Sequence, residues 1–438
     1  MDDREIIGGS DYIKLILWIA VMSSPVALLT MIFLALYTKG GEFVRETLPA
    51  ALHLSQPVCT ILIATLGGLL VGLGLRYLGV RHGESLPKEM EAGRVPYQGV
   101  PGFILTALVG LVSGASLGPE SPLGHMGAAA ASWLAERLKL PKDKSRIMTL
   151  SGISATFGGY LLSPIGGAFM SMEFTGSLTY PIYTNLIAAV VAALIGALLM
   201  LVFAGLVPPR GLLNFPEYTS FQWIHILYAV LFGLVGLVWA FLFKAVFGFV
   251  TRLVTPLSRF PVLKPVVGGL VFGLIGALLP LTLYSGEEEL NVILAEGAEI
   301  GIAMLLLLAV VKLFTLSVCM SSGFPGGFVF PLFFSAGSLG YALHLLLPFI
   351  PLDVAMISMM AGIGGAVMRM PFTVIVVMMV MSSPTSLPIS IVAGFTGFLS
   401  ATMLAAGNAR KAMYQAAQER KAVYISSAPE ANDEGQSG

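Results

Sequence analysis

The chain has 438 residues, of which 56% are hydrophobic and 11% are charged, and its mean hydropathy is +0.87. Soluble globular proteins carry about 25% charged residues, so the composition excludes that class and favours a protein of the lipid bilayer. The formal net charge is zero and basic clusters lack interleaved aromatic residues, so we expect no nucleic-acid partner. Two cysteines and five scattered histidines predict no metal site, and we expect no cofactor.

Apolar stretches long enough to cross a bilayer recur along the chain. Examples lie at 12–37, 186–207 and 223–243. A spanning helix needs about 20 such residues. The 50 glycines and 26 prolines suit closely packed, often broken helices. The predicted fold class is therefore an all-α polytopic membrane protein.

Polar segments between these stretches predict the topology. The loop at 135–146 holds five Lys or Arg residues and the segment 409–421 holds four, so the positive-inside rule places both in the cytoplasm. We expect a multi-pass protein of the cell inner (plasma) membrane. The predicted parts are a cytoplasmic segment (1–11), a first membrane repeat (12–210), a second membrane repeat (211–406), and a basic helix with a disordered tail (407–438).

An internal repeat is the most informative feature of the sequence. S-G-A-S-L-G-P-E-S-P from Ser113 matches S-G-F-P-G-G-F-V-F-P from Ser322 at an offset of 209. The stretches that end at Pro164 and Pro371 match at an offset of 207. Duplicated halves with Gly- and Pro-interrupted segments at matching positions are typical of inverted-repeat transporters and point to the binding site.

Both copies of the first motif predict a helix that starts inside the bilayer, at Ser121/Pro122 and at Phe330/Pro331. Proline in the first helical turn loses no hydrogen bond, and glycine allows close approach of the backbone. A helix N-terminus offers unpaired N–H groups and about half a positive charge. Two such ends predict an anion site that needs no cationic side chain.

Glu120 lies at the first of these helix starts. Its carboxylate could occupy the anion site itself, and protonation would neutralise and release it, so that a free anion and this side chain compete. The alternative is a permanent capping carboxylate that stabilises the helix and moves nothing. Ionisable residues within the membrane are by default functional, which favours the gating role.

The paired motifs resemble those of the CLC chloride channels and proton/chloride exchangers. The stretch GPESP (118–122) is similar to the G-K/R-E-G-P motif of that family, and GFVFP (327–331) to its G-x-F-x-P motif. More weakly, GESLP (83–87) resembles G-S-G-I-P, and 163–174 resembles the helix that carries a cytoplasmic acidic residue. The resemblance implies an inverted repeat of broken helices, a homodimer, and one anion path per subunit.

The resemblance also implies roles for individual residues. Glu120 takes the place of the gating glutamate. Exchangers of the family carry an internal glutamate that relays protons, and the residue that aligns with it here is Phe174. Glu173 lies one position earlier and is either a proton relay or a buried structural carboxylate. The implied anion-binding residues are Ser85, Gly118, Ser121, Gly327, Phe328, Val329 and Tyr414.

Several positions depart from the family pattern. Pro119 and Ser121 replace the basic residue and the glycine that flank the glutamate. Glu84 falls where the family has its anion-binding serine, so that either Ser85 substitutes for it or the cytoplasmic entrance is acidic. Tyr414 is either the central tyrosine of the family or an interfacial aromatic residue beside a basic helix.

We therefore expect transport of a small monovalent anion, most simply chloride, coupled to proton counter-transport and not an enzymatic reaction. The alternatives are a passive chloride channel and a cation/proton antiporter. The pattern GxSxG at 114–118 also matches a hydrolase motif, but a base to pair with the serine is missing from the matching apolar helices apart from His125. Lys312 is expected to reach an interface or to pair with Glu173 or another carboxylate near the path.

Overall fold

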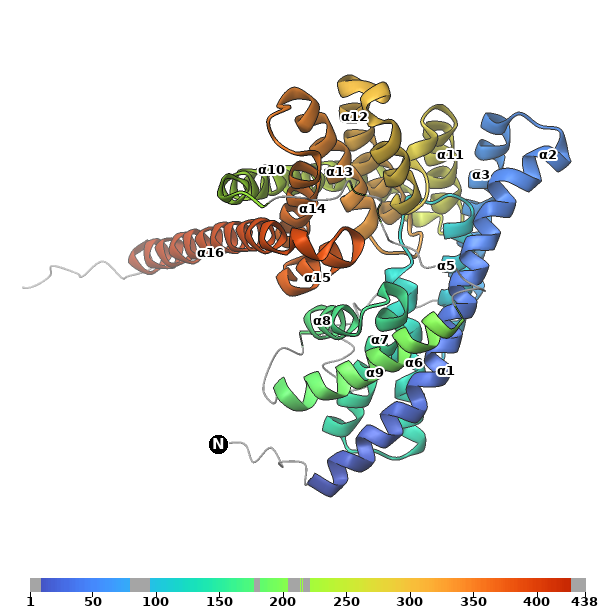
Figure 1. Cartoon of the computed structure of the whole chain (residues 1–438), viewed down its shortest axis with the longest axis vertical. Coiled ribbons are helices and arrows are strands. Elements are labelled where there is room, and N and C mark those ends of the chain that lie inside the picture. Colours follow the sequence, from blue (N-terminus) through green and yellow to red (C-terminus); the bar gives the residue numbers. More distant parts are fainter. Residues whose placement is uncertain are drawn as a thin grey trace, which may run out of the picture.

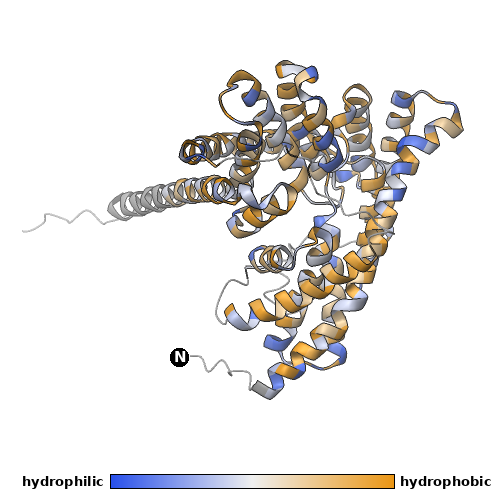
Figure 2. Cartoon of the chain, viewed as in Figure 1, coloured by the Kyte–Doolittle hydropathy of each residue, from blue (hydrophilic) through white to orange (hydrophobic). Residues whose placement is uncertain are grey.

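The structure is a computed structural model that describes the backbone of residues 9–78, 95–176, 182–203, 213, 215 and 221–426, and the side chains of these residues between 10 and 407. Within these ranges the chain is helical, and seven helices are long and apolar enough to cross a membrane. Figure 2 shows apolar residues along the lengths of these helices. The predicted all-α polytopic fold class is confirmed.

The helices of the first repeat are α1 (Gly9–Glu42), α2 (Leu48–Leu52), α3 (Gln56–Tyr77), α5 (Val100–Val112), α6 (Glu120–Arg137), α7 (Lys142–Leu161), α8 (Pro164–Phe174) and α9 (Ile182–Val202). Those of the second are α10 (Trp223–Val254), α11 (Leu263–Leu278), α12 (Glu287–Ser322), α13 (Val329–Leu346), α14 (Leu352–Met368), α15 (Pro371–Met381) and α16 (Leu387–Ser426). In Figure 1, α6, α7 and α9 occupy the lower part of the molecule and α12, α13 and α14 the upper part.

The backbone repeats at the two offsets found in the sequence. Gly114 and Gly323 both have φ = 92°, a left-handed conformation that favours glycine. Leu162 and Arg369, which are 207 residues apart, both follow a helix with positive φ, of 50° and 56°. Each is followed two residues later by the proline that opens an 11-residue helix, α8 or α15. The inverted duplication therefore extends to individual turns.

Three contacts between the two repeats position the site. α3 packs along α11, and α8 packs against α15. Glycines make the first contact close: a Cβ at Gly68 would collide with the backbone of Pro265, and one at Gly269 with that of Ala64. The third meeting point joins the loops before α6 and α13, which places both helix starts within the protein interior.

The two ends of α1 lie at opposite faces of the protein. At its start, Asp11 pairs with Lys144 of the basic loop (2.9 Å). Beyond its other end, Arg45 pairs with Glu288 at the start of α12 (2.8 Å). A helix of 34 residues is about 51 Å long, which exceeds the roughly 30 Å of a bilayer core. Because the basic loop is predicted to be cytoplasmic, the Arg45 end is predicted to face outward.

Candidate functional site

The two repeated motifs meet at a pair of glycines. The N–H of Gly118 donates to the carbonyl of Gly327 (2.9 Å), and the N–H of Gly327 donates to the carbonyl of Gly118 (2.7 Å). These residues lie 209 positions apart, the offset of the sequence repeat. The bridge holds the start of α6 beside the start of α13, and both glycines belong to the predicted anion-binding set.

The carboxylate of Glu120 lies across this bridge. A Cβ added at either Gly118 or Gly327 would collide with the carboxylate oxygens, so only glycine leaves room for it. The Oε1 atom accepts a hydrogen bond from the backbone N–H of Phe330 (3.3 Å), in the first turn of α13. The side chain is only 5% exposed. Glu120 therefore begins one helix and places its charge at the N-terminus of the other.

Neither helix start is capped by the side chain of the residue that precedes it. The residues before α6 and α13 are Pro119 and Phe328, and no hydrogen bond from their side chains satisfies the first amides. Helix starts were predicted at Ser121/Pro122 and Phe330/Pro331, and the helices begin one residue earlier, at Glu120 and Val329. The amide that contacts the carboxylate is that of Phe330. The roles of Phe328 and Val329 as ligands of a transported anion stay predictions.

A second buried carboxylate, Glu287, lies near the first. The Tyr160 hydroxyl at the end of α7 donates to Oε1 of Glu287 (2.6 Å), and Glu287 is 4% exposed. Tyr160 also packs edge-on against the ring of Phe330, with centroids 5.6 Å apart. Glu287 is the first residue of α12, and the sequence did not single it out. The three consecutive glutamates, 287–289, were the available signal.

Lys312 is fully buried within α12 and does not reach an interface. Its ammonium donates to the carbonyls of Thr282 (3.2 Å), Leu283 (2.8 Å) and Tyr284 (2.8 Å), and it lies 4.8 Å from the centre of the Phe334 ring. The expectations of snorkelling and of a pair with Glu173 were both wrong, because the turn before α12 presents three carbonyls that a protonated amine can satisfy. Lys312 therefore holds the segment that leads into Glu287.

Glu173, at the end of α8, contacts the second repeat. Its carboxylate accepts hydrogen bonds from the N–H of Phe372 (3.2 Å) and from the N–H and hydroxyl of Thr373 (both 2.6 Å). These groups form the first turn of α15, whose amides would otherwise have no intrahelical partner. The geometry is that of a capping carboxylate and corresponds to the structural alternative for this residue.

Replacement of this carboxylate tests the two roles left open. We expect Glu173→Gln to lower the free energy of unfolding by about 1 to 3 kcal/mol, because an amide replaces a charged acceptor of several hydrogen bonds. Thermal unfolding in detergent measures this loss, with exposed Glu136 on α6 as the control (Glu136→Gln). Unchanged stability together with a reduced ratio of proton to anion flux would instead support a proton relay.

Two predicted anion-binding residues lie outside the part of the chain that the structure describes. Ser85, with Glu84, belongs to the undescribed stretch 79–94, and the side chain of Tyr414 is beyond the described ones, although its backbone continues α16. Ser121 lies in the first turn of α6, where its carbonyl bonds to Nδ1 of His125 (2.8 Å). His125 is thus a satisfied interior polar group.

Comparisons with known proteins agree with this architecture. Residues 67–403 match the family described as voltage gated chloride channel. YfeO of Escherichia fergusonii, named provisionally as an ion-transport protein, is 31% identical over 338 residues, which cover 74% of this chain and 77% of the relative. YfeO of Escherichia coli strain SMS-3-5 is 32% identical over 336 residues, with the same coverage of both chains.

Two solved structures share the fold. A CLC-type fluoride/proton antiporter has a TM-score of 0.69 at 22% identity, covering 89% of this chain and 96% of the other. A slow cyanobacterial Cl⁻/H⁺ antiporter has a TM-score of 0.73 at 19% identity, covering 89% and 94%. The family comprises channels and transporters of anions. With its paired motifs joined at Gly118 and Gly327, the chain belongs to the CLC family.

Proposed function

We propose that this protein exchanges a small monovalent anion, chloride in the first instance, for protons across the bacterial inner membrane. It works as a homodimer with one path per subunit, and Glu120 is the gate. The observation that carries the proposal is the hydrogen bond from the Phe330 amide to the Glu120 carboxylate. This amide belongs to the first turn of α13, where partial positive charge favours an anion. The carboxylate thus takes the position that a transported anion would need.

Protonation then links the two fluxes. An ionised Glu120 competes with the anion at the start of α13, whereas a neutral carboxyl loses its attraction to that end and leaves room for the anion. One side chain therefore alternates between binding a proton and excluding an anion. Gly118 and Gly327 bring the two helix starts together, and we propose that the backbone at Ser121, Phe328 and Val329 contributes to binding the anion once the carboxylate has moved. Backbone donors recognise charge and size, so fluoride and nitrate are the competing substrates.

Purified protein in liposomes provides the test. We expect an outward chloride gradient to drive proton uptake into the liposomes, because each anion that leaves must exchange with a proton at Glu120. A chloride electrode and an internal pH dye follow both fluxes, and protein-free liposomes are the control. Chloride flux without proton movement would support a passive channel instead. Chloride, fluoride and nitrate are compared at equal gradients, and the absence of flux for all three would reject the proposal.

A further inference from the structure

Glu120 is buried, so its proton must arrive through the protein. Only 5% of the residue is exposed. Its Oε2 atom has no hydrogen-bond partner within the described residues. A buried carboxylate oxygen without a partner is costly in free energy unless it exchanges a proton or moves. The gate therefore has one oxygen held by the Phe330 amide and a second one available to accept a proton.

A line of polar groups leads away from the gate toward the Arg45 end of α1. Tyr160 donates to Glu287, and the Ser285 hydroxyl makes a longer contact with the other carboxylate oxygen of Glu287 (3.5 Å). The Tyr37 hydroxyl of α1 in turn donates to Ser285 (3.3 Å). The Tyr160 ring packs edge-on against Phe330, whose backbone N–H donates to Glu120, so Tyr160 contacts both Glu287 and the residue that binds the gate. Three elements thus meet around Glu287.

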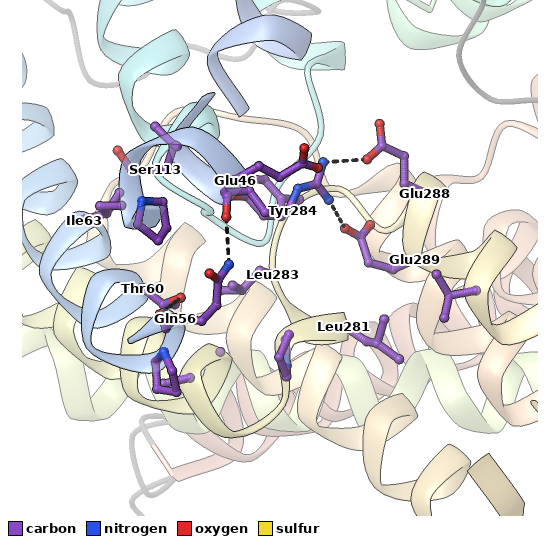
Figure 3. Close-up of a pocket in the computed structure, with 18 residues that line it drawn as sticks. Glu46, Gln56, Thr60, Ile63, Ser113, Leu281, Leu283, Tyr284, Glu288 and Glu289 are labelled. Atoms are coloured by element: carbon purple, nitrogen blue, oxygen red, sulfur yellow. Dashed lines mark hydrogen bonds and ion pairs between the residues drawn. The ribbon is translucent and has the colours of Figure 1, made fainter. Parts of the chain in front are cut away.

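This line ends at an open pocket. A cavity of about 10 Å³, bordered by Tyr37 and Ser285, has room for about one water molecule. It shares Arg45, Tyr284 and two glutamates with a cavity of about 520 Å³, which Figure 3 shows between the end of α1, α3 and the start of α12. In the larger cavity Arg45 is paired with Glu288 (2.8 Å) and Glu289 (3.6 Å). These two carboxylates are paired with a cation, and the Glu287 carboxylate is in contact with the hydroxyls of Tyr160 and Ser285.

We propose that Glu287 is the proton-loading carboxylate for Glu120 and that the Tyr160 hydroxyl connects the two. A proton enters through the pocket at Arg45 and Tyr284 and binds Glu287. The O–H of the neutral Glu287 then donates to Tyr160 while Tyr160 releases its own proton to Oε2 of Glu120. The step leaves Glu287 ionised, Tyr160 neutral and Glu120 protonated, so one proton is transferred and no tyrosinate forms.

The surroundings of Glu287 suit this role. The titratable and charged groups around it are Tyr160 of α7, Tyr37 of α1, Glu120 of α6, Glu288 and Glu289 of its own helix, Arg45 beyond α1, and Lys312 behind the turn. Lys312 fixes the backbone at 282–284, so Ser285 and Glu287 are held in place. The inference rests on the proposed role of Glu120 as a gate that titrates.

Two variants and a matched control test the relay in proteoliposomes. Tyr160→Phe removes only the hydroxyl and keeps the ring packed on Phe330, and Glu287→Gln removes the titratable group. Glu296→Gln, an exposed carboxylate on the same helix, is the control. We expect both variants to lower the proton flux and the rate of the response to an acid pH jump at least about tenfold, because a positioned proton carrier is lost. Anion flux is expected to fall together with the proton flux, because each anion that leaves exchanges with a proton at Glu120.

The outcomes separate this inference from the proposed function. Proton flux and pH response equal to those of Glu296→Gln would overturn the relay while leaving the gate intact. If the wild-type protein conducts anions without moving protons, the proposed coupling fails, and the relay is tested by the rate of the response to the pH jump alone. A response in both variants equal to that of the control would then overturn the relay. If the wild-type protein conducts no anions, the proposed function fails first, and the relay falls with it. If Glu287→Gln does not fold, the proton flux and the pH-jump response of Tyr160→Phe alone test the relay.

Discussion

Replacing Glu120 by glutamine is expected to remove the pH dependence of anion flux and to abolish proton coupling. In the wild-type protein, flux should rise as the pH falls, because the neutral carboxyl no longer binds the start of α13. Glutamine has nearly the same shape, can still accept from the Phe330 amide, and cannot titrate. Glu120→Ala should conduct at least as fast as Glu120→Gln, since it leaves an opening between Gly118 and Gly327. Anion efflux and internal pH are measured across a series of buffers.

The structural alternative for Glu120 makes a different prediction. If the carboxylate serves only as a cap, both variants should lose stability by about 0.5 to 2 kcal/mol and retain the wild-type pH profile of any remaining flux. Thermal unfolding in detergent distinguishes the two cases, with Glu296→Gln as the control. A pH profile in Glu120→Gln that matches the wild type would contradict the gating role.

Replacing Lys312 by methionine is expected to cause the largest loss of stability. The change leaves the carbonyls of Thr282, Leu283 and Tyr284 without their shared donor and deprives the buried carboxylate of Glu289 of a nearby positive charge. Removing one partner from a buried charged site costs about 3 to 5 kcal/mol. Thermal unfolding and the yield of monodisperse protein measure the effect.

Lys244 supplies the matched control for this variant. It is an exposed lysine on α10, and Lys244→Met removes the same charge and chain length from a surface position. We expect it to unfold within experimental error of the wild type, because exposed charges contribute little to stability. Equal unfolding of Lys312→Met and Lys244→Met would show that the three carbonyls find other donors and would overturn the role assigned to Lys312.

Local features of the sequence predicted the fold class and the centre of the site. Glycine and proline act on the backbone next to them, so the starts of α6 and α13 could be placed to within one residue. The offset of 209 predicted that Gly118 and Gly327 occupy equivalent positions, and the structure joins them by two hydrogen bonds. A repeat is visible in a single sequence because both copies must satisfy the same backbone constraints.

Contacts between distant helices could not be predicted in the same way. Tyr160 and Glu287 are 127 positions apart, and only Tyr160 belongs to a repeated motif, the one that ends at Pro164. Lys312 lies in an apolar helix where snorkelling and burial have the same sequence pattern, and its carbonyl partners become apparent only when the turn at 280–284 is folded against it. The amide that contacts Glu120 depends on the rotation of α13 about its axis, so the contact with Phe330 could not be read from the sequence.

The sequence by itself determined that this chain spans a bilayer as two related halves with helix starts inside it, because hydropathy, glycine and proline act locally. Only the tertiary structure decided which groups those helix starts face. A buried carboxylate or amine is stable only with particular donors and acceptors around it. For Glu120 and Glu287 these come from helices more than 100 positions away, and for Lys312 from a turn 28 to 30 positions earlier. The partners of Glu120, Glu287 and Lys312 follow from helix packing, which no stretch of the sequence contains.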